Sequence, residues 1–410
     1  MNVFDIFLER GFVEQTSDER AVREMLDDPV TCYIGFDPTS DSFHCGSLVP
    51  IMALAHMQRS GHRVIALVGG GTSMIGDPSG KTEARRMLTV EQIDANAGGL
   101  RKQLSHFLDF DGGRALMLNN AQWLRPLNYI EFLRDIGRHF SVNKMLSAET
   151  YRARLETGLS FIEFNYMLLQ AYDYLHLYRS HGCTLQMGGN DQWGNILAGA
   201  DLIRRVEGGK AEALTFPLLE TATGAKMGKT ELGAVWLDPE RTSPYDYYQY
   251  WINTDDRDVE RFLALFTFLP MGEVRRLGSL EGAAMREAKE VLAYEATRLL
   301  HGADEADGAR DAARALFSGG SPGAGEAVPT GPLDASLLQG EGTPAFILFA
   351  RAGLARSRGE ARRLIEQGGA YINGRRIERF DEPVTGRDVE GGYILLRAGK
   401  KKYLRLGPVA

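Results

Sequence analysis

Cysteine is scarce in this sequence: the 410 residues contain only Cys32, Cys45 and Cys183. Three cysteines so far apart form neither a disulfide framework nor the paired spacing of a metal site, which favours a reducing compartment. The chain also lacks a long apolar run, and "MNVFDIFLER" carries acidic side chains where a signal peptide would carry basic ones. We therefore expect a cytoplasmic protein with no membrane span and no metal ligated by its own side chains.

A phosphate-binding P-loop is lacking as well, although "IGDPSGKT" (75–82) looks like the end of one. The pattern G-x-x-x-x-G-K-[ST] needs a glycine at position 75, where this chain has Ile75. Asp77 would also set a negative charge against the phosphates that such a loop holds. The stretch therefore has another task, and Asp77 needs another role.

Charge is unevenly distributed along the chain. The net charge is −7, but residues 346–410 contain 14 Lys and Arg against 7 Asp and Glu, so the remainder carries −14. A basic module on an acidic body is typical of a protein whose tail binds a polyanion, although a merely solvated basic surface has the same composition.

Length and pattern predict several domains, because a chain of this size usually forms two or three. Short apolar segments at 31–36, 63–70, 115–120 and 184–191 alternate with helical patterns, which indicates an α/β fold with a Rossmann-like parallel sheet over 1–243. Residues 244–317 have a mainly α-helical pattern. Ten of the fifteen residues in 318–332 are Gly, Pro or Ser, typical of a flexible linker, and 333–410 is expected to be a small α+β module.

The stretch "SFIEFNYMLLQAYDYL" (160–175) is expected to line a pocket. Ser160 and Glu163 form a capping box, so a helix begins here. Tyr166, Gln170 and Asp173 then fall on one face of that helix. This polar row could hold an ammonium group at one end and a hydroxyl group at the other. A solvated helix face is the alternative, but such faces usually carry Lys, Arg and Glu.

Polar residues also follow the predicted strands, where ligands bind in open parallel sheets. In "FDPTSDSFHCGSL" (36–48), Thr39 and His44 can donate hydrogen bonds to phosphate in front of a helix N-terminus; the alternative is a turn capped by Asp37 and Ser47. In "QMGGNDQWGN" (186–195), Asp191 can accept from ribose hydroxyls and Gln192 can donate to a carbonyl, although a plain turn is an equal alternative.

The loop "GAKMGKT" (224–230) places two lysines three residues apart. Lys226 and Lys229 could close on a polyphosphate while Gly224 and Gly228 let the loop move. An exposed basic loop without a function is the alternative.

Together these stretches resemble the bacterial tyrosyl-tRNA synthetases, which are class I aminoacyl-tRNA synthetases. "YIGFDPTSDSFHCGSL" is similar to their first signature, which normally ends H-I-G-H, and "KMGKT" to their second. "YMLLQAYD" and "GGNDQWGN" are similar to the tyrosine and ribose segments, and the tail resembles the S4-like RNA-binding module of the family. The resemblance covers nearly the whole chain and implies a Rossmann-like catalytic domain, a helical subdomain over 244–317 that contacts tRNA and an S4-like domain.

The resemblance implies that tyrosine is activated by ATP with Mg²⁺ and then transferred to the 3′ end of tRNA(Tyr), by a homodimer. It assigns tyrosine binding to Tyr33, Asp77, Tyr166, Gln170, Asp173 and Gln192. It assigns ATP binding to Asp37, Gly46, Ser47, Gly189, Asp191 and Lys229, and catalysis to Thr39, His44, Lys226, Lys229 and Thr230. For RNA it implies the basic residues Arg356, Arg358, Arg362, Arg363, Arg375 and Arg376.

Two positions depart from the family pattern. Ser47 replaces the last His of H-I-G-H, and Ile34 stands where a ribose-contacting Cys is common. We therefore expect activity with altered ATP affinity. Three alternatives stay open at this point: a tryptophanyl-tRNA synthetase, a small-molecule nucleotidyltransferase, and an inactive RNA-binding scaffold. The Tyr33–Asp173 pair argues against the first, the basic tail against the second, and the presence of His44 and both loop lysines against the third.

Overall fold

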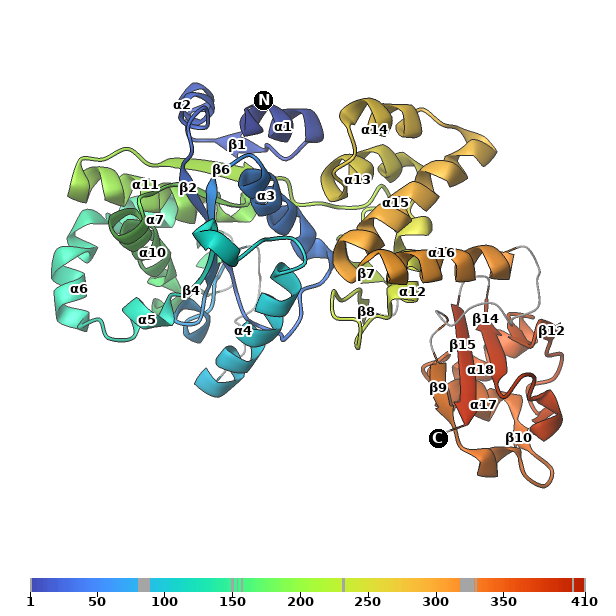
Figure 1. Ribbon diagram of the computed structural model, residues 1–410. Coiled ribbons are helices and arrows are strands. Elements are labelled where there is room, and N and C mark those ends of the chain that lie inside the picture. The colour runs from blue at the N-terminus through green and yellow to red at the C-terminus, as the bar shows by residue number, and fades with distance from the viewer. Residues whose placement is uncertain are drawn as a thin grey trace. The chain divides into compact units, whose positions relative to one another are not determined.

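The computed structural model describes residues 2–79, 89–148, 151–152, 154–155, 158–230, 233–317, 328, 330–399 and 402–408 (Figure 1). These residues form two compact units. The first contains residues up to 238 together with 255–285, and the second contains 239–254 together with the chain from 286 onward.

The first unit is built on a sheet with the strand order β1-β6-β5-β2-β3-β4. Its strands are β1 (Gln15–Thr16), β2 (Thr31–Phe36), β3 (Arg63–Val68), β4 (Ala115–Asn119), β5 (Cys183–Gly189) and β6 (Glu212–Phe216). All neighbours pair in parallel except β1, which is antiparallel to β6. The predicted parallel α/β sheet is confirmed. The central strands β2 and β3 are mostly apolar, as is typical of parallel strands with helices on both faces.

Right-handed crossovers decide which helices cover which face. From β2 the chain runs through α3 (Leu48–Arg59) to β3, while from β5 it runs through α11 (Trp193–Glu207) to β6, in the opposite direction along the sheet. The two helices therefore lie on opposite faces, and α10 (Tyr166–His181) packs beside α11 (Figure 1). The strand order thus reverses between β2 and β5.

The first unit also contains the helices α1 (Val3–Arg10), α2 (Glu19–Met25), α4 (Val90–Leu104), α5 (Ala121–Leu124), α6 (Tyr129–Asp135), α7 (Val142–Ser147), α9 (Phe161–Phe164), α13 (Val259–Phe266) and α14 (Met271–Gly278). The capping box of Ser160 and Glu163 is present. The capping box lies at the start of the four-residue helix α9, and Asn165 separates α9 from α10. The segment therefore forms two helices, where we expected one.

The expected helical subdomain 244–317 is divided between the units. Helix α13 belongs to the first unit, where Arg10 at the end of α1 donates to the carbonyls of Ala264 and Thr267 at 2.7 and 2.9 Å. Helix α12 (Pro244–Ile252) belongs to the second unit and packs on α16 (Ala303–Phe317), next to α15 (Met285–His301). Sequence pattern detects helices but not which neighbours bury their apolar faces, so our boundaries at 243 and 317 differ from the observed division.

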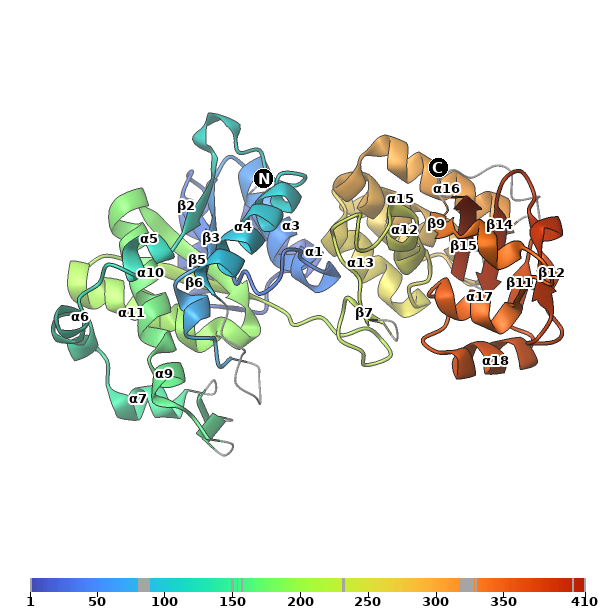
Figure 2. The same cartoon turned by 90° about the horizontal axis from the view of Figure 1, so that it is seen from below.

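The second unit ends in a sheet with the order β12-β11-β14-β15-β9. Its strands are β9 (Thr330–Leu333), β11 (Ala370–Ile372), β12 (Arg375–Arg376), β14 (Ile394–Ala398) and β15 (Lys402–Pro408), with β10 (Thr343–Pro344) and β13 (Pro383–Val384) paired separately. Helices α17 (Ala345–Arg351) and α18 (Arg358–Glu366) pack beside each other (Figure 2). These helices and the sheet share one hydrophobic core, in which Phe349, Ile365 and Leu396 are buried.

The linker expected at 318–332 is shorter at its C-terminal end. Residues 318–327 and 329 lie outside the described part of the chain. Val328 is buried with Tyr245, Ala312 and Leu395, and residues 330–332 belong to β9, which pairs in parallel with β15. Pro332 is tolerated there because β9 is an edge strand.

Candidate active site

A cavity of about 500 Å³ lies at the carboxyl ends of β2 and β5, where the strand order reverses. This is the position at which open α/β sheets bind ligands. The cavity brings together thirteen of the residues that the sequence analysis selected: Tyr33, Asp37, Thr39, His44, Gly46, Ser47, Asp77, Tyr166, Gln170, Asp173, Gly189, Asp191 and Gln192. Ile34, one of the two departures, also lines it.

One end of the cavity holds two groups suited to a phenol. Tyr33 is buried in β2, and among the described residues its hydroxyl has no hydrogen-bond partner. Asp173 on α10 is buried and accepts from Asn120 Nδ2 at 2.8 Å and from Trp123 Nε1 at 2.7 Å. Burial raises the pKa of Asp173 to about 7, although the two hydrogen bonds oppose this increase. Burial, followed by the nearby Asp173, raises the pKa of the Tyr33 phenol well above its ordinary value.

Asp77 is a second buried carboxylate in the same cavity. It accepts from the Ser79 backbone N–H at 2.9 Å and from Gln192 Nε2 at 2.7 Å. Burial raises its pKa to about 6, and the negative charge of Asp37 adds to the increase. A cation placed here would reverse this destabilisation of the ionised form. The "GDPSG" turn therefore presents a carboxylate to the cavity, and residues 80–88, which follow it, lie outside the described chain.

The turn after β2 supplies donors. His44 caps the short 3₁₀ helix η1 (Cys45–Ser47), where the Gly46 N–H donates to its Nδ1 at 3.0 Å. In the neutral ring the proton is then on Nε2, so His44 can donate a hydrogen bond. Ser47 lines the cavity, and its side chain makes no capping hydrogen bond at the start of α3. The alternative that Ser47 serves only as a helix cap is therefore wrong.

The lysine loop lies directly against this turn. A Cβ added to Gly228 would come within 2.7 Å of the Gly46 nitrogen, and Gly228 has a φ of 77°, so only glycine fits without strain. Neighbouring backbone bonds join the two segments: Cys45 N–H donates to Val235 O, and Val235 N–H donates to Gly228 O, both at 2.9 Å. The two family signatures are thus in contact through their backbones.

Of the predicted loop side chains, only that of Lys226 belongs to the described part of the structure. Lys226 is exposed and is not part of the cavity lining. Lys229 and Thr230 form β7 with β8 (Gly233–Ala234), but their side chains lie outside the described part of the structure. Bringing Lys226 to a ligand in the cavity would need the loop to move.

The six predicted RNA-binding arginines are all exposed in the second unit. Arg358, Arg362 and Arg363 lie on α18, and Arg356 lies just before it. The Arg362 guanidinium stacks on Phe346 and Phe380, at 4.3 and 5.0 Å from the ring centroids. Arg375 differs from the others because it pairs with Glu382 and with Asp388, so its charge is largely neutralised.

Asn120 and Trp123 are site residues that the sequence analysis missed. Both follow β4, and their donors converge on the Asp173 carboxylate. Trp123 also stacks on His176, with ring centroids 4.3 Å apart. The available signal was the polar "NN" that ends the strand segment 115–120, at the same edge of the sheet as the other ligand-binding segments.

Two general properties accompany this site. Within the described residues, no helix combines the length and the apolar character needed to cross a membrane. The three cysteines are all buried and free.

Comparison with known proteins identifies the family. Residues 25–318 match the family of class I tRNA synthetases for tryptophan and tyrosine, and residues 335–406 match the tyrosine–tRNA ligase SYY-like C-terminal domain. Tyrosine–tRNA ligases of Desulfatibacillum aliphaticivorans and Caldanaerobacter subterraneus are 58% and 55% identical, over 99% of this chain and 98% and 99% of theirs. The structure of a C-terminally truncated mitochondrial tyrosyl-tRNA synthetase from Aspergillus nidulans aligns with a TM-score of 0.70 at 32% identity, covering 77% of this chain and 94% of that one. The chain therefore belongs to the bacterial tyrosyl-tRNA synthetases, and its activity is that of a tyrosine–tRNA ligase.

Proposed function

We propose that the cavity between β2 and β5 binds tyrosine and MgATP together, and that the residues singled out from the sequence divide this task. The observation that carries the proposal is the pair of buried carboxylates, Asp77 and Asp173, in one cavity with Tyr33, whose hydroxyl has no partner within the described parts of the chain. A ligand with a cationic group and a hydroxyl group complements all three.

Tyrosine has both of these groups. In the proposed arrangement its ammonium group binds Asp77, Tyr166 and Gln170, and its phenol exchanges hydrogen bonds with Tyr33 and Asp173. Asn120 and Trp123 hold the Asp173 carboxylate in place. Gln192, which donates to Asp77, is near enough to the ammonium position to bind the adjacent carboxylate.

ATP would occupy the part of the cavity formed by the turns after β2 and β5. Gly189 and Asp191 would bind its ribose. The part of the cavity that ATP occupies would also be lined by Asp37, Gly46 and Ser47. The tyrosine carboxylate attacks the α-phosphate in line, forming tyrosyl-adenylate and releasing pyrophosphate. No covalent bond to the enzyme is needed, so catalysis depends on positioning and charge stabilisation. Thr39 and His44 would donate to the phosphates, with Lys226, Lys229 and Thr230 joining when the loop closes.

Replacing Tyr33 by phenylalanine tests the phenol assignment. A neutral hydrogen bond contributes about 1 kcal/mol, so kcat/KM for tyrosine in ATP–pyrophosphate exchange should fall about fivefold. The value for phenylalanine should not fall, because phenylalanine cannot make that bond. Equal losses for both amino acids would show that Tyr33 supports the fold and does not read the phenol.

We also propose that the enzyme is a homodimer, joined through an apolar surface of the first unit. Most of the large apolar side chains that are exposed in the described residues lie between positions 129 and 162, including Ile130 and Phe161, which are 70% and 72% exposed. Large apolar side chains that are exposed in one part of the chain are typical of an interface between subunits. Light scattering should give about twice the chain mass of 45.3 kDa, and Phe161→Asp should shift it toward one chain. A monomeric mass for the unaltered protein would overturn this proposal.

The exposed arginines of the second unit would bind tRNA through its phosphates. Their positions on and beside α18 support this role for Arg356, Arg358, Arg362 and Arg363, whereas the ion pairs of Arg375 weaken the case for that residue. The three free cysteines suit a cytoplasmic enzyme.

A further inference from the structure

The segment that leads into the lysine loop folds back on itself. Met227 N–H donates to Leu219 O at 3.2 Å, Glu220 and Lys226 form an isolated bridge, and Thr221 N–H donates to Ala225 O at 2.8 Å. The tip is closed by Gly224, whose φ is 78° and whose N–H donates to Thr221 O. We call residues 219–227 the loop hairpin. Lys226 lies on its returning arm, opposite Glu220.

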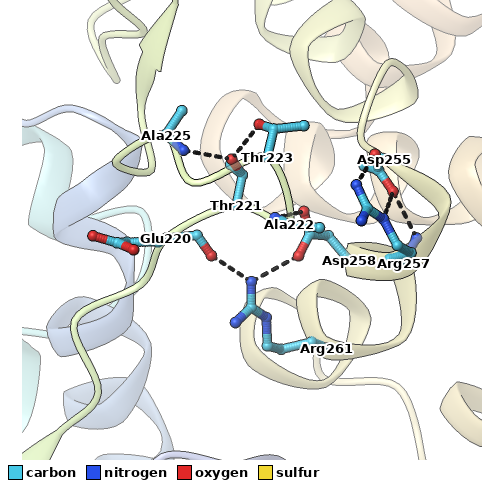
Figure 3. Close-up of polar contacts among 9 residues, drawn as sticks. All are labelled: Glu220, Thr221, Ala222, Thr223, Ala225, Asp255, Arg257, Asp258 and Arg261. Carbon is cyan, nitrogen blue, oxygen red and sulfur yellow. Dashed lines mark hydrogen bonds and ion pairs between the residues drawn. The ribbon is translucent and has the colours of Figure 1, made fainter.

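The outgoing arm of the loop hairpin is fastened to the start of α13 by a buried carboxylate (Figure 3). Asp258 is 3% exposed, and its two oxygens have different partners. Oδ2 accepts from the Ala222 N–H at 2.7 Å, while Oδ1 accepts from the Arg261 guanidinium at 2.7 Å. The same nitrogen of Arg261 donates to the Glu220 carbonyl at 2.6 Å.

Asp258 and Arg261 thus hold both ends of the stretch 220–222. Glu220 is the residue that pairs with Lys226, so this contact fixes the backbone opposite the lysine. The carboxylate of Asp258 is buried while Arg261 is partly exposed, and hydrogen bonds to a charged group are stronger than those between neutral groups. Beyond Lys226, the contact of Gly228 with Gly46 is a second anchor. Lys226 therefore lies between two fixed points.

We propose that Asp258 and Arg261 are positioning residues for adenylate formation: they hold the loop hairpin so that Lys226 reaches the phosphates when the loop closes. The inference rests on the role proposed above for Lys226. Neither residue lines the cavity, so each acts through the loop and not on the substrates directly.

The test compares exchange kinetics and tyrosine affinity in variants of the full-length enzyme. In Asp258→Asn, the amide can accept from only one of the two donors and turns its NH₂ toward the other, so kcat should fall about tenfold. Arg261→Gln should cause a similar loss, and it changes a partly exposed side chain that the fold tolerates more easily. The Kd for tyrosine should stay within twofold, because Asp77 and Asp173 are untouched.

Asp255→Asn is the matched control. Asp255 precedes the 3₁₀ helix η6 (Asp256–Asp258) and pairs with Arg257 at 2.9 Å. Figure 3 shows this pair close to the contact between Asp258 and the loop hairpin but separate from it. The substitution removes the same charge as Asp258→Asn does. Its kcat should remain close to that of the unaltered enzyme. Trypsin should cleave after Lys226 faster in Asp258→Asn than in Asp255→Asn, because the hairpin is released.

A double variant distinguishes a loss of kcat that acts through Lys226 from a loss caused by disruption of the fold. If Asp258 acts through Lys226, then adding Asp258→Asn to Lys226→Ala should cost little more than Lys226→Ala alone. A full tenfold further loss, or wild-type kcat in both Asp258→Asn and Arg261→Gln, would overturn the inference. A wild-type kcat in Lys226→Ala would instead remove the role proposed for the lysine itself.

Discussion

Replacing Asp77 by asparagine should lower kcat/KM for tyrosine about a thousandfold in pyrophosphate exchange. The substitution leaves the bound ammonium group buried without a counter-charge, and breaking a buried ion pair costs about 3–5 kcal/mol. The KM for ATP should change only a few-fold. Ser79→Ala is the control, because the backbone N–H that donates to Asp77 and the carboxylate charge both remain. An unchanged KM for tyrosine in Asp77→Asn would place the ammonium group elsewhere.

The same variant should alter the pH profile of tyrosine binding. The pKa of Asp77 is raised to about 6 and that of Asp173 to about 7, so tyrosine affinity should rise as pH increases through this range and both carboxyls ionise. In Asp77→Asn only the step near 7 should remain. The stability of the folded enzyme without tyrosine should change in the opposite direction as pH rises. Its folded state binds these protons more tightly than the unfolded chain does, so its free energy of unfolding should fall between about pH 4 and pH 7.

Reversing the charge of Arg358 and Arg363 together should raise the KM for tRNA about a hundredfold in the charging reaction. At 0.1 M salt each phosphate contact raises the affinity roughly tenfold. The slope of the logarithm of the binding constant against the logarithm of the salt concentration should therefore decrease by the contribution of about two phosphate contacts. Exchange, which needs no tRNA, should be unaffected.

A double reversal of Arg351 and Arg387 is the charge-matched control. Both are exposed arginines of the same unit, outside the predicted RNA-binding set. If the control weakened charging as much as Arg358→Glu/Arg363→Glu, the attraction would depend on net charge and not on the surface of α18.

Much of the catalytic fold could be predicted because its signals are local. Buried strands such as 31–36 are continuous apolar runs, and the polar residues that follow them mark the ligand edge of a parallel sheet. The resemblance to the family, and not these patterns, led us to expect Tyr33, Asp77 and Asp173 in one site, and all three do line one cavity.

The rest depends on contacts between distant segments, which no local pattern encodes. Trp123 is an ordinary aromatic residue in the sequence and becomes part of the site only because α5 faces α10. Asp258 similarly looks like one acid in the run "TDDRDV", and only the fold shows that its carboxylate holds the loop hairpin. The assignment of α12 and α13 to different units likewise follows from packing and not from their own residues.

The strand order of the second unit has a consequence for how the protein is made. Strand β15 lies between β14 and β9, so the sheet cannot close until residue 408 has left the ribosome. The catalytic sheet needs nothing beyond β6, which ends at Phe216, and can assemble while the remainder is still being translated. The nascent chain should therefore complete the sheet that carries the cavity early, and the sheet of the second unit only after synthesis has passed the last strand.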